Sequence, residues 1–437
     1  MKAEAPISDT RIRAAARDPR ADDRLYRRVA TALLAILLPC YGVAMIDRLN
    51  VGYAKLQFMN DLHFNEAVFG VAAGSLYVGY ILFEVPSNLM LARRGLRLTL
   101  LRIMSLWGLF SMSMAFASGR WGFYAIRFLV GAAEAGFFPG VLFYLTLWFP
   151  NRYRARVIAL FAIAVPLSGL IAGPASAWIM THLAGSGGLQ GWQWLFLIEG
   201  FPAICLGVLA YRVLPDAPES ARFLSAEDRA RIRRDLADDA DAIGAAASFG
   251  EALRRPRTYG LAAVYFAFYA AQSILLLWVP TLLRNAGVRD LAAIGWRSAA
   301  IFLVGAVGMA AIGWSSDRSG ERRRHLIVCG TVASGALLSL RLAAGSPDAT
   351  TLCLMAASAA MFAFLALFWT VPALYLGRNA RAGGIALVSS IGAAGSALSP
   401  MLIGGMQVLT GSLFGAIAAL ALLFLASLAV IARYAPA

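Results

Sequence analysis

The sequence RFLVGAAEAGFFP at positions 127–139 places charged residues inside an apolar run that extends over positions 121–148. A run of this length is expected to cross a bilayer as one helix. Arg127, Gly131 and Glu134 follow the i, i+4, i+7 spacing of a single helical face, which puts the two charges roughly 10 Å apart. A charge at the bilayer centre costs at least about 2.5–3.5 kcal/mol, so both must face protein or a water-filled cavity. The stretch predicts either an ion-pair network between helices or a pathway for substrate and protons.

The composition of the whole chain indicates a membrane protein. Its 437 residues are 60% hydrophobic and only 14% charged, whereas a soluble domain carries about 25% charged residues. Because lipid offers backbone groups no hydrogen-bond partners, we predict an all-α integral membrane protein in contact with the bilayer. The net charge of +15 comes from arginines clustered between apolar runs, and no basic patch is interleaved with aromatic residues. Nucleic acid is therefore not an expected partner.

The sequence contains no pattern typical of a metal site or an enzyme. Its four cysteines are far apart and its three histidines fall near predicted loops, so neither a disulfide framework nor a metal site is expected. No nucleotide-binding loop and no nucleophile–base arrangement is visible in the sequence. We expect no cofactor, no ATP-driven transport and no enzymatic activity.

Twelve apolar spans are predicted, in two halves of six. A polar, charge-dense segment separates the halves and is expected to be a partly helical cytoplasmic loop. The predicted organisation is a cytoplasmic N-terminal tail (1–28), a six-helix bundle (29–214), the central loop (215–256) and a second six-helix bundle (257–437). The predicted spans are 29–54, 67–91, 98–117, 121–148, 155–182, 192–214, 257–284, 291–315, 323–344, 350–376, 383–408 and 411–434.

The loops between spans indicate an orientation and an internal repeat. Arginines gather in the loops on one side, which places that side and both termini in the cytoplasm. The loop after the second span, ARRGLR at positions 92–97, resembles the loop after the eighth, although alanine replaces the acid. Related loops at equivalent positions predict two halves about an axis along the membrane normal, with a substrate site between them near the midplane. The candidate residues of a conformational motif after the eighth span are Gly313, Asp317, Arg318, Gly320 and Arg322.

The first span contains an adjacent acid and base, Asp47 and Arg48. Neighbouring helical residues point about 100° apart, so one can face a cavity while the other serves a neighbouring helix. Tyr41 shares the face of Arg48. The planar fork of arginine binds carboxylates in a bidentate manner, and two intramembrane arginines, Arg48 and Arg127, therefore predict an anionic substrate that bears a carboxylate.

Asp47 and Glu134 are the candidate proton carriers. A buried carboxyl group balanced by a nearby arginine can be protonated from one side and release its proton to the other. The alternative is a permanently ionised pair with Arg48 or Arg127. Two further acids, Glu84 and Glu199, are placed near cytoplasmic helix ends, where bonds to a helix terminus or a loop arginine are expected.

The second half offers polar side chains that could line the opposite wall of the site. Tyr265, Tyr269 and Gln272 follow i, i+4, i+7 spacing in the seventh span. Serine and glycine in membrane helices also serve close packing, and this alternative stays open for the eleventh span. The candidate substrate-binding residues in this half are Tyr269, Gln272, Trp369, Ser390 and Ser396.

The chain resembles the major facilitator superfamily and, within it, the anion:cation symporter family. The stretches that carry the resemblance are IDRLNVGYA, EVPSNLMLARRGLRLTLLRIMSLWG, RFLVGAAEAGFFPGVLFYLTLWFP, RYRARVIALFAIAVPLSGLIAGPASAWIM and GWQWLFLIEGFPA. They are most similar to bacterial tartrate, phthalate and hydroxyphenylacetate permeases. The resemblance implies twelve helices, a bacterial inner-membrane location, a monomer and proton-coupled uptake of organic anions. It also implies that Asp47 and Glu134 are proton-linked and that Arg48 and Arg127 line the substrate path.

The eleventh span departs from the family pattern. Family members commonly have an asparagine there that helps to hold substrate, whereas this chain reads GAAGS at positions 392–396. Either Ser390 or Ser396 replaces the amide, or the substrate has fewer hydroxyl groups. The departure favours an aromatic or less hydroxylated carboxylate over a sugar acid.

Two other functions are alternatives to symport. A proton-antiporting exporter would typically extend the Gly-Pro of the fifth span to Gly-Pro-x-x-Gly-Gly, but Ala177 and Trp178 stand there. A membrane sensor that binds an anion without moving it would be expected to carry a cytoplasmic signalling domain, whereas only a short tail and loop are predicted.

Overall fold

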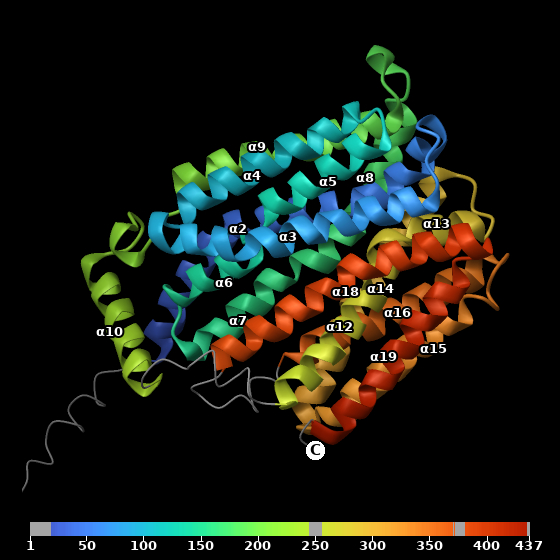
Figure 1. The fold of residues 1–437 in the computed structure, drawn as a ribbon. Helices are drawn as coiled ribbons and strands as arrows, with labels where there is room; N and C mark the ends of the chain where they lie inside the picture. The colour runs from blue at the N-terminus through green and yellow to red at the C-terminus, as the bar shows by residue number, and fades with distance from the viewer. Residues whose placement is uncertain (1–18, 244–255, 370, 372–380, 435–437) are drawn as a thin grey trace, which may run out of the picture.

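The computed structural model describes residues 19–243, 256–369, 371 and 381–434, and the described residues are helical or lie in short connections. Two bundles lie side by side along their length (Figure 1). The first contains α2 (Pro19–Asp61), α3 (Glu66–Arg94), α4 (Leu96–Ser113), α5 (Arg120–Glu134), α6 (Phe137–Thr146), α7 (Asn151–Ala162), α8 (Ala164–His182) and α9 (Gly191–Val213). The second contains α12 (Pro256–Leu277), α13 (Val279–Asn285), α14 (Leu291–Ser319), α15 (Arg323–Ser339), α16 (Pro347–Phe368), α18 (Arg381–Thr410) and α19 (Phe414–Tyr434).

These helices confirm the predicted fold class. Eleven helical stretches in the described residues are long and apolar enough to cross a membrane. The ninth predicted span corresponds to α15, whose 17 residues extend over about 25 Å at 1.5 Å per residue and complete the set of twelve. The helix α2 begins at Pro19, before the predicted start of the first span. The end of the tenth predicted span lies outside the described residues.

Three predicted spans consist of two helices each instead of one. The fourth span breaks between α5 and α6, where Gly136 has a φ of 86°, a value that favours glycine. The fifth span breaks at Ile163 and the seventh at Trp278. Each break precedes a proline, Pro166 or Pro280, whose missing N–H cannot bond the carbonyl four residues earlier. The expectation of one continuous helix over 121–148 is therefore wrong, and the face that carries Arg127 ends at Glu134.

The two halves are held together where small residues let backbones approach. α3 packs against α18, and α8 packs against α14. A side chain added at Gly70 would overlap the carbonyl of Pro400, and one added at Gly173 would overlap the carbonyl of Gly295. These contacts involve the start of α3, the second half of α18, the middle of α8 and the start of α14, which lie toward the end of the molecule that carries α13 (Figure 1). We call this end the α13 end.

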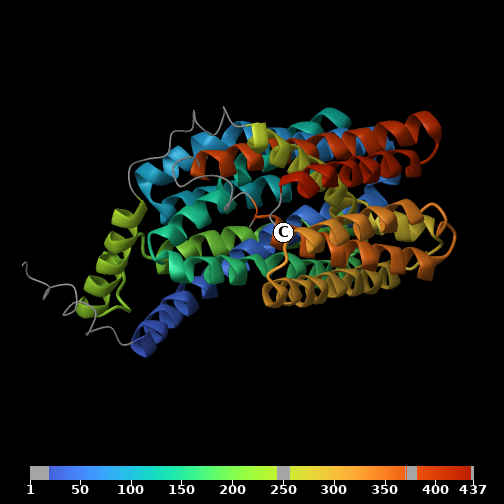
Figure 2. The same ribbon diagram turned by 90° about the horizontal axis from the view of Figure 1, so that it is seen from below.

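The central loop is docked on the first half at the opposite end. Figures 1 and 2 show α10 (Ala226–Ile243) there, beside the start of α2. The hydroxyl of Tyr26 donates to Asp235 at 2.9 Å. Arg152 binds both Asp22 and Asp235 at 3.0 Å. Because these partners come from α2, α7 and α10, the helix α10 is part of the first half.

Candidate functional site

An ion pair between α2 and α5 lies inside the first half. Arg48 donates from Nε to Oε1 of Glu134 at 2.8 Å, and its Nη2 lies 2.7 Å from the same oxygen. The Glu134 side chain is 2% exposed and the Arg48 side chain 21% exposed. The second oxygen of Glu134, Oε2, has no hydrogen-bond partner among the described residues. The pair therefore leaves one carboxylate oxygen available to a proton or a donor.

Arg127 interacts electrostatically with Glu134 but is not part of the ion pair. The residue is 3% exposed, and its Nε has no hydrogen-bond partner in the part of the chain that the structure describes. It interacts electrostatically with Asp47, Tyr77 and Glu134. A buried guanidinium with an open donor can bind an anionic group strongly, because the low local dielectric strengthens charge-assisted hydrogen bonds.

Asp47 points away from Arg48 toward α4, as the spacing of adjacent helical residues predicted. It is 2% exposed and accepts hydrogen bonds from Trp107 Nε1 at 2.8 Å, from Asn50 Nδ2 at 3.2 Å and from the Ser111 hydroxyl. Three donors satisfy a carboxylate well. Asp47 is thus held by its own half, and it interacts electrostatically with Arg127 and with Glu134.

Aromatic rings form the walls on both sides of Arg48. In the first half, Tyr41 stacks on Phe161 with ring centroids 4.7 Å apart. In the second half, the Tyr265 hydroxyl donates to the Tyr269 hydroxyl at 3.0 Å, and Tyr265 meets Trp369 edge to face at 4.8 Å. Tyr41 and Tyr269 both interact electrostatically with Arg48. Three of the predicted substrate residues, Tyr41, Tyr269 and Arg48, are therefore brought together across the two halves.

The remaining predicted residues of the second half differ in their placement. Ser396 is 2% exposed and lies within hydrogen-bonding reach of Tyr77 in the first half. Gln272 is buried, at 5% exposure. Ser390 is exposed on α18. Of the two serines considered as substitutes for the missing amide, Ser396 is the one that reaches the other half.

Two tyrosines of α3 belong to the site and were not predicted. Tyr77 interacts electrostatically with Arg48, Glu134 and Arg127, and the guanidinium of Arg48 lies 5.5 Å from the centre of the Tyr80 ring. Their i, i+3 spacing in an apolar span could have predicted them, since it places both hydroxyl groups on one side of the helix. The donors to Asp47 on α4, Trp107 and Ser111, show the same kind of signal at i, i+4.

Comparison with known proteins places this arrangement in a family. The sequence profile of the Major Facilitator Superfamily matches residues 37–400. The chain belongs to the major facilitator superfamily. Like other members of this superfamily it is a multi-pass membrane transporter, and the predicted resemblance is confirmed.

Several relatives of this superfamily member align over nearly the whole chain. The protein NicT of Pseudomonas putida, named as a metabolite transport protein, is 43% identical over 89% of each chain. A protein of Agrobacterium vitis named as a tartrate transporter is 38% identical over 90% of each, and a quinolone resistance transporter of Acinetobacter baumannii is 35% identical over 89% of each. A bacterial homologue of the lysosomal transporter Spinster, solved in an inward-facing occupied conformation, shares the fold. Its TM-score is 0.68 at 18% identity, with 92% of this chain and 94% of that chain covered.

In this superfamily member, the candidate conformational motif lies at the end of α14, away from the Arg48–Glu134 pair. Arg322 forms an ion pair with Asp317. Gly320 ends the helix in the left-handed region, with a φ of 69°. Arg318 lies over the ring of a tryptophan one turn earlier, at 5.5 Å, and no described atom lies within 4 Å of a side chain added at Gly313.

The matching loop of the first half, at positions 92–97, has no acidic residue of its own and instead contacts an acid from the central loop. The backbone N–H of Arg97 donates to Oδ1 of Asp216 at 3.1 Å, and its Nε donates to the Tyr211 carbonyl at 2.8 Å. Gly95 has a φ of 80° and leaves room for Asp216. The start of the central loop therefore provides the carboxylate in this loop, a contact that the sequence pattern did not predict.

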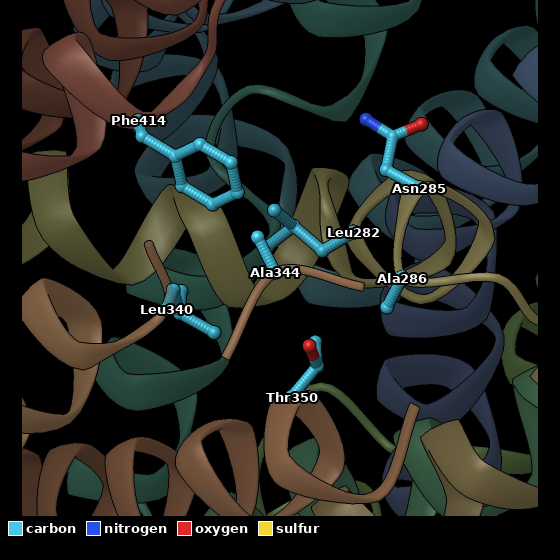
Figure 3. A pocket seen from close by; sticks show the side chains of 7 residues that line it. All are labelled: Leu282, Asn285, Ala286, Leu340, Ala344, Thr350 and Phe414. Atoms are coloured by element: carbon cyan, nitrogen blue, oxygen red, sulfur yellow. The ribbon is translucent and has the colours of Figure 1, made fainter. Parts of the chain in front are cut away.

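A small cavity at the α13 end of this transporter does not have the properties of a substrate site. Figure 3 shows its lining, which comes from α13, α16, α19 and the turns that follow α13 and α15. Its volume is about 50 Å³, far below the roughly 300–1,000 Å³ of typical small-molecule sites. The lining residues are Leu282, Asn285, Ala286, Leu340, Ala344, Thr350 and Phe414.

Proposed function

We propose that this transporter carries a small organic anion into the cell together with protons, by alternating access around the Arg48–Glu134 pair. The observation that supports it best is the ion pair itself, in which Glu134 occupies the guanidinium that a substrate carboxylate would need. The name of one relative, for tartrate transport, agrees with a carboxylate substrate.

The proposed coupling follows from competition for one arginine. While Glu134 is ionised, Arg48 is bound to it at 2.7 Å and its fork is partly occupied. A proton on Glu134 removes the charge that holds the arginine, and the substrate carboxylate then takes its place in a bidentate arrangement. Arg127 with its open Nε supplies the second donor. Proton and anion therefore bind together, and the internal ion pair forms again once both have left.

Alternating access requires that the two halves part at one end while they close at the other. In the structure the halves are in close contact at the α13 end, through α3–α18 and α8–α14. Tyr41 and Tyr269 face Arg48 from different halves, so rocking of the halves changes the distance between the two walls of the site. We assign the α10 end, where the arginine-rich loops are predicted, to the cytoplasm of a bacterial inner membrane, and we take the monomer as the transporting unit.

The test is uptake into vesicles that contain the purified protein. Radiolabelled tartrate, phthalate, hydroxyphenylacetate and nicotinate are each offered with and without an inward proton gradient. A gradient of about one pH unit sustains roughly tenfold accumulation per proton carried. We expect this accumulation in the wild type and its loss in Glu134→Gln, with counterflow exchange retained. Uptake that is indifferent to the gradient would contradict proton coupling, and failure to bind any carboxylate would contradict the role of the arginines.

The second candidate function is proton-driven export. It is favoured by the similarity to a quinolone resistance transporter, although the exporter signature of the fifth span is absent from the sequence. The same vesicles decide between the two functions. With the gradient reversed, an antiporter accumulates its substrate, whereas a symporter loses the substrate that was loaded before.

A further inference from the structure

A third carboxyl group, that of Glu199, lies inside the first half and takes no part in the proposed coupling of protons to substrate at the Arg48–Glu134 pair. Its sequence position suggested a bond to a helix terminus or loop arginine near a cytoplasmic end. The structure corrects this expectation: Glu199 lies well inside α9, is 7% exposed, and accepts a hydrogen bond from the Ser176 hydroxyl at 3.1 Å. Its second oxygen, Oε2, has no hydrogen-bond partner in the described ranges.

The groups that face Glu199 do not include a cation among the described residues. From α8 the neighbour is Ser176, and from α2 the neighbours are Asn50, Asp47 and Tyr53. α4 packs against the adjacent residue Gly200, where it presents the Met112 side chain and the backbone of Gly108 and Met112, none of which carries a charge. Burying an ionised carboxylate without a positive partner is far more costly than burying the neutral acid. The surroundings of Glu199 are therefore suited to a carboxyl group that carries a proton.

A polar path connects Glu199 with the substrate site. Asn50 lies against the Glu199 carboxyl group and donates from Nδ2 to Asp47 at 3.2 Å. The carbonyl oxygen of Asn50 has no hydrogen-bond partner within the described residues, so a proton on Glu199 would supply a donor next to an oxygen that lacks one. Asp47 in turn interacts electrostatically with Arg127 and Glu134. The charge state of Glu199 is thus linked to the pair that binds substrate.

The same region touches the second half. On α8, Gly173 lies one turn before Ser176 and packs on Gly295 of α14. Tyr53, next to Glu199, forms a hydrogen bond with Ser298 of α14. Separation of the halves at the α13 end would remove the α14 cover from α8 and Tyr53 and admit water beside Glu199.

We propose that Glu199 is a proton-carrying residue of the transport cycle, protonated while the halves are joined at the α13 end and exchanging its proton with water on that side when they part. This role rests on the proposed proton coupling. In the exchange the O–H bond of the acid breaks, the proton passes to water, and the carboxylate left behind is solvated by the water that has entered. Asp47, held by Trp107, Ser111 and Asn50, transmits the change of charge without itself moving.

The experiment uses the full-length protein with Glu199→Gln, which keeps the bond from Ser176 and cannot titrate. Asp61→Asn is the matched control, since Asp61 accepts a bond from Trp192 of the same helix α9 at 2.8 Å but is exposed. Infrared absorption of protonated carboxyl groups is recorded at neutral pH, and gradient-driven accumulation and counterflow are measured in vesicles. We expect Glu199→Gln to lose one carboxylic-acid band. It should also lose the roughly tenfold accumulation of substrate that a gradient of about one pH unit drives. Its counterflow should match that of the wild type, and the Asp61→Asn variant should match the wild type in all three measurements.

The outcomes separate this role from the symport proposal. If the wild type accumulates substrate and Glu199→Gln does so equally, the role of Glu199 is wrong and symport stands. An unchanged infrared band in Glu199→Gln also overturns it, because the side chain then carries no proton. If the wild type itself fails to accumulate any of the carboxylates under the gradient, symport fails and the transport role of Glu199 fails with it.

Discussion

The guanidinium of Arg48 binds only one oxygen of Glu134, with both Nε and Nη2 directed at Oε1 at 2.8 and 2.7 Å. A bidentate pair would use two donors and two oxygens. The other oxygen, Oε2, is buried and has no hydrogen-bond partner in the described residues. The pair is therefore incompletely satisfied, and two events can complete it or replace it: protonation of Glu134 and arrival of a second carboxylate.

The first prediction concerns the geometry of Arg48. In Arg48→Lys the positive charge remains but the planar fork is lost, so we expect substrate affinity to fall by about 10- to 100-fold, equivalent to a charged hydrogen bond of roughly 1.5–3 kcal/mol. Equilibrium binding of the substrate identified by uptake measures this. The matched control is Arg102→Lys, because Arg102 is half-buried and binds Ser87 within the same half. Equal affinity in Arg48→Lys and wild type would contradict bidentate binding.

The second prediction separates the two candidate proton carriers of the site. Asp47→Asn turns an amide N–H₂ toward donors, since Trp107 and Ser111 both donate to this side chain. We expect a loss of stability of about 2–3 kcal/mol, seen as a lower midpoint of thermal unfolding in detergent. Asp61→Asn is the control, because Asp61 also accepts an indole N–H but is exposed. An unchanged midpoint in Asp47→Asn would mean that Asp47 is protonated in the folded protein.

The charged positions of the site could be found from the sequence, whereas their pairing could not. Arg48, Arg127 and Glu134 stand out because charges in apolar spans are costly. Helical spacing relates Arg127 to Glu134 along one helix, but the partner that Glu134 takes, Arg48, comes from α2. Which helices become neighbours depends on the packing of the whole bundle, and spacing within one span carries no information about that.

The breaks in the helices could be predicted from prolines, although the length of an apolar run alone suggests one continuous helix. Pro166 and Pro280 each leave a carbonyl without its helical donor, and each follows an observed break.

Glu199 has a property that the sequence does not contain. Its distance from the ends of α9 was readable, but the absence of a cation near it among the described residues follows from the tertiary arrangement of α2, α4 and α8.

A third prediction tests the packing that positions Glu134. A side chain at Gly131 would overlap the Leu76 carbonyl of α3, so Gly131→Ala must force α5 away from α3. We expect a destabilisation of about 1–3 kcal/mol, typical of overpacking, together with a loss of substrate binding. Gly122 is the matched control on α5, because no described atom lies within 4 Å of its added side chain. Gly122→Ala should be neutral or stabilising by about 0.5–1 kcal/mol. A similar loss in both variants would trace the effect to helix α5 itself and not to its contact with α3.

The last prediction concerns the closure of the α13 end. Lys55 of α2 is 2% exposed, and its Nζ lies 2.6 Å from Glu66 and 3.8 Å from the centre of the Trp278 ring of the second half. A desolvated cation–π contact contributes about 2 kcal/mol, so its removal in Lys55→Met should shift the balance toward an open α13 end by about 30-fold. Distances between spin labels on the two halves at this end measure the shift. Trp278→Phe is the control that keeps a ring under the cation and should shift the balance less. If Lys55→Met leaves the distance distribution of the wild type unchanged, the lysine is satisfied by Glu66 alone and closure at this end rests on the glycine contacts of α3 and α8.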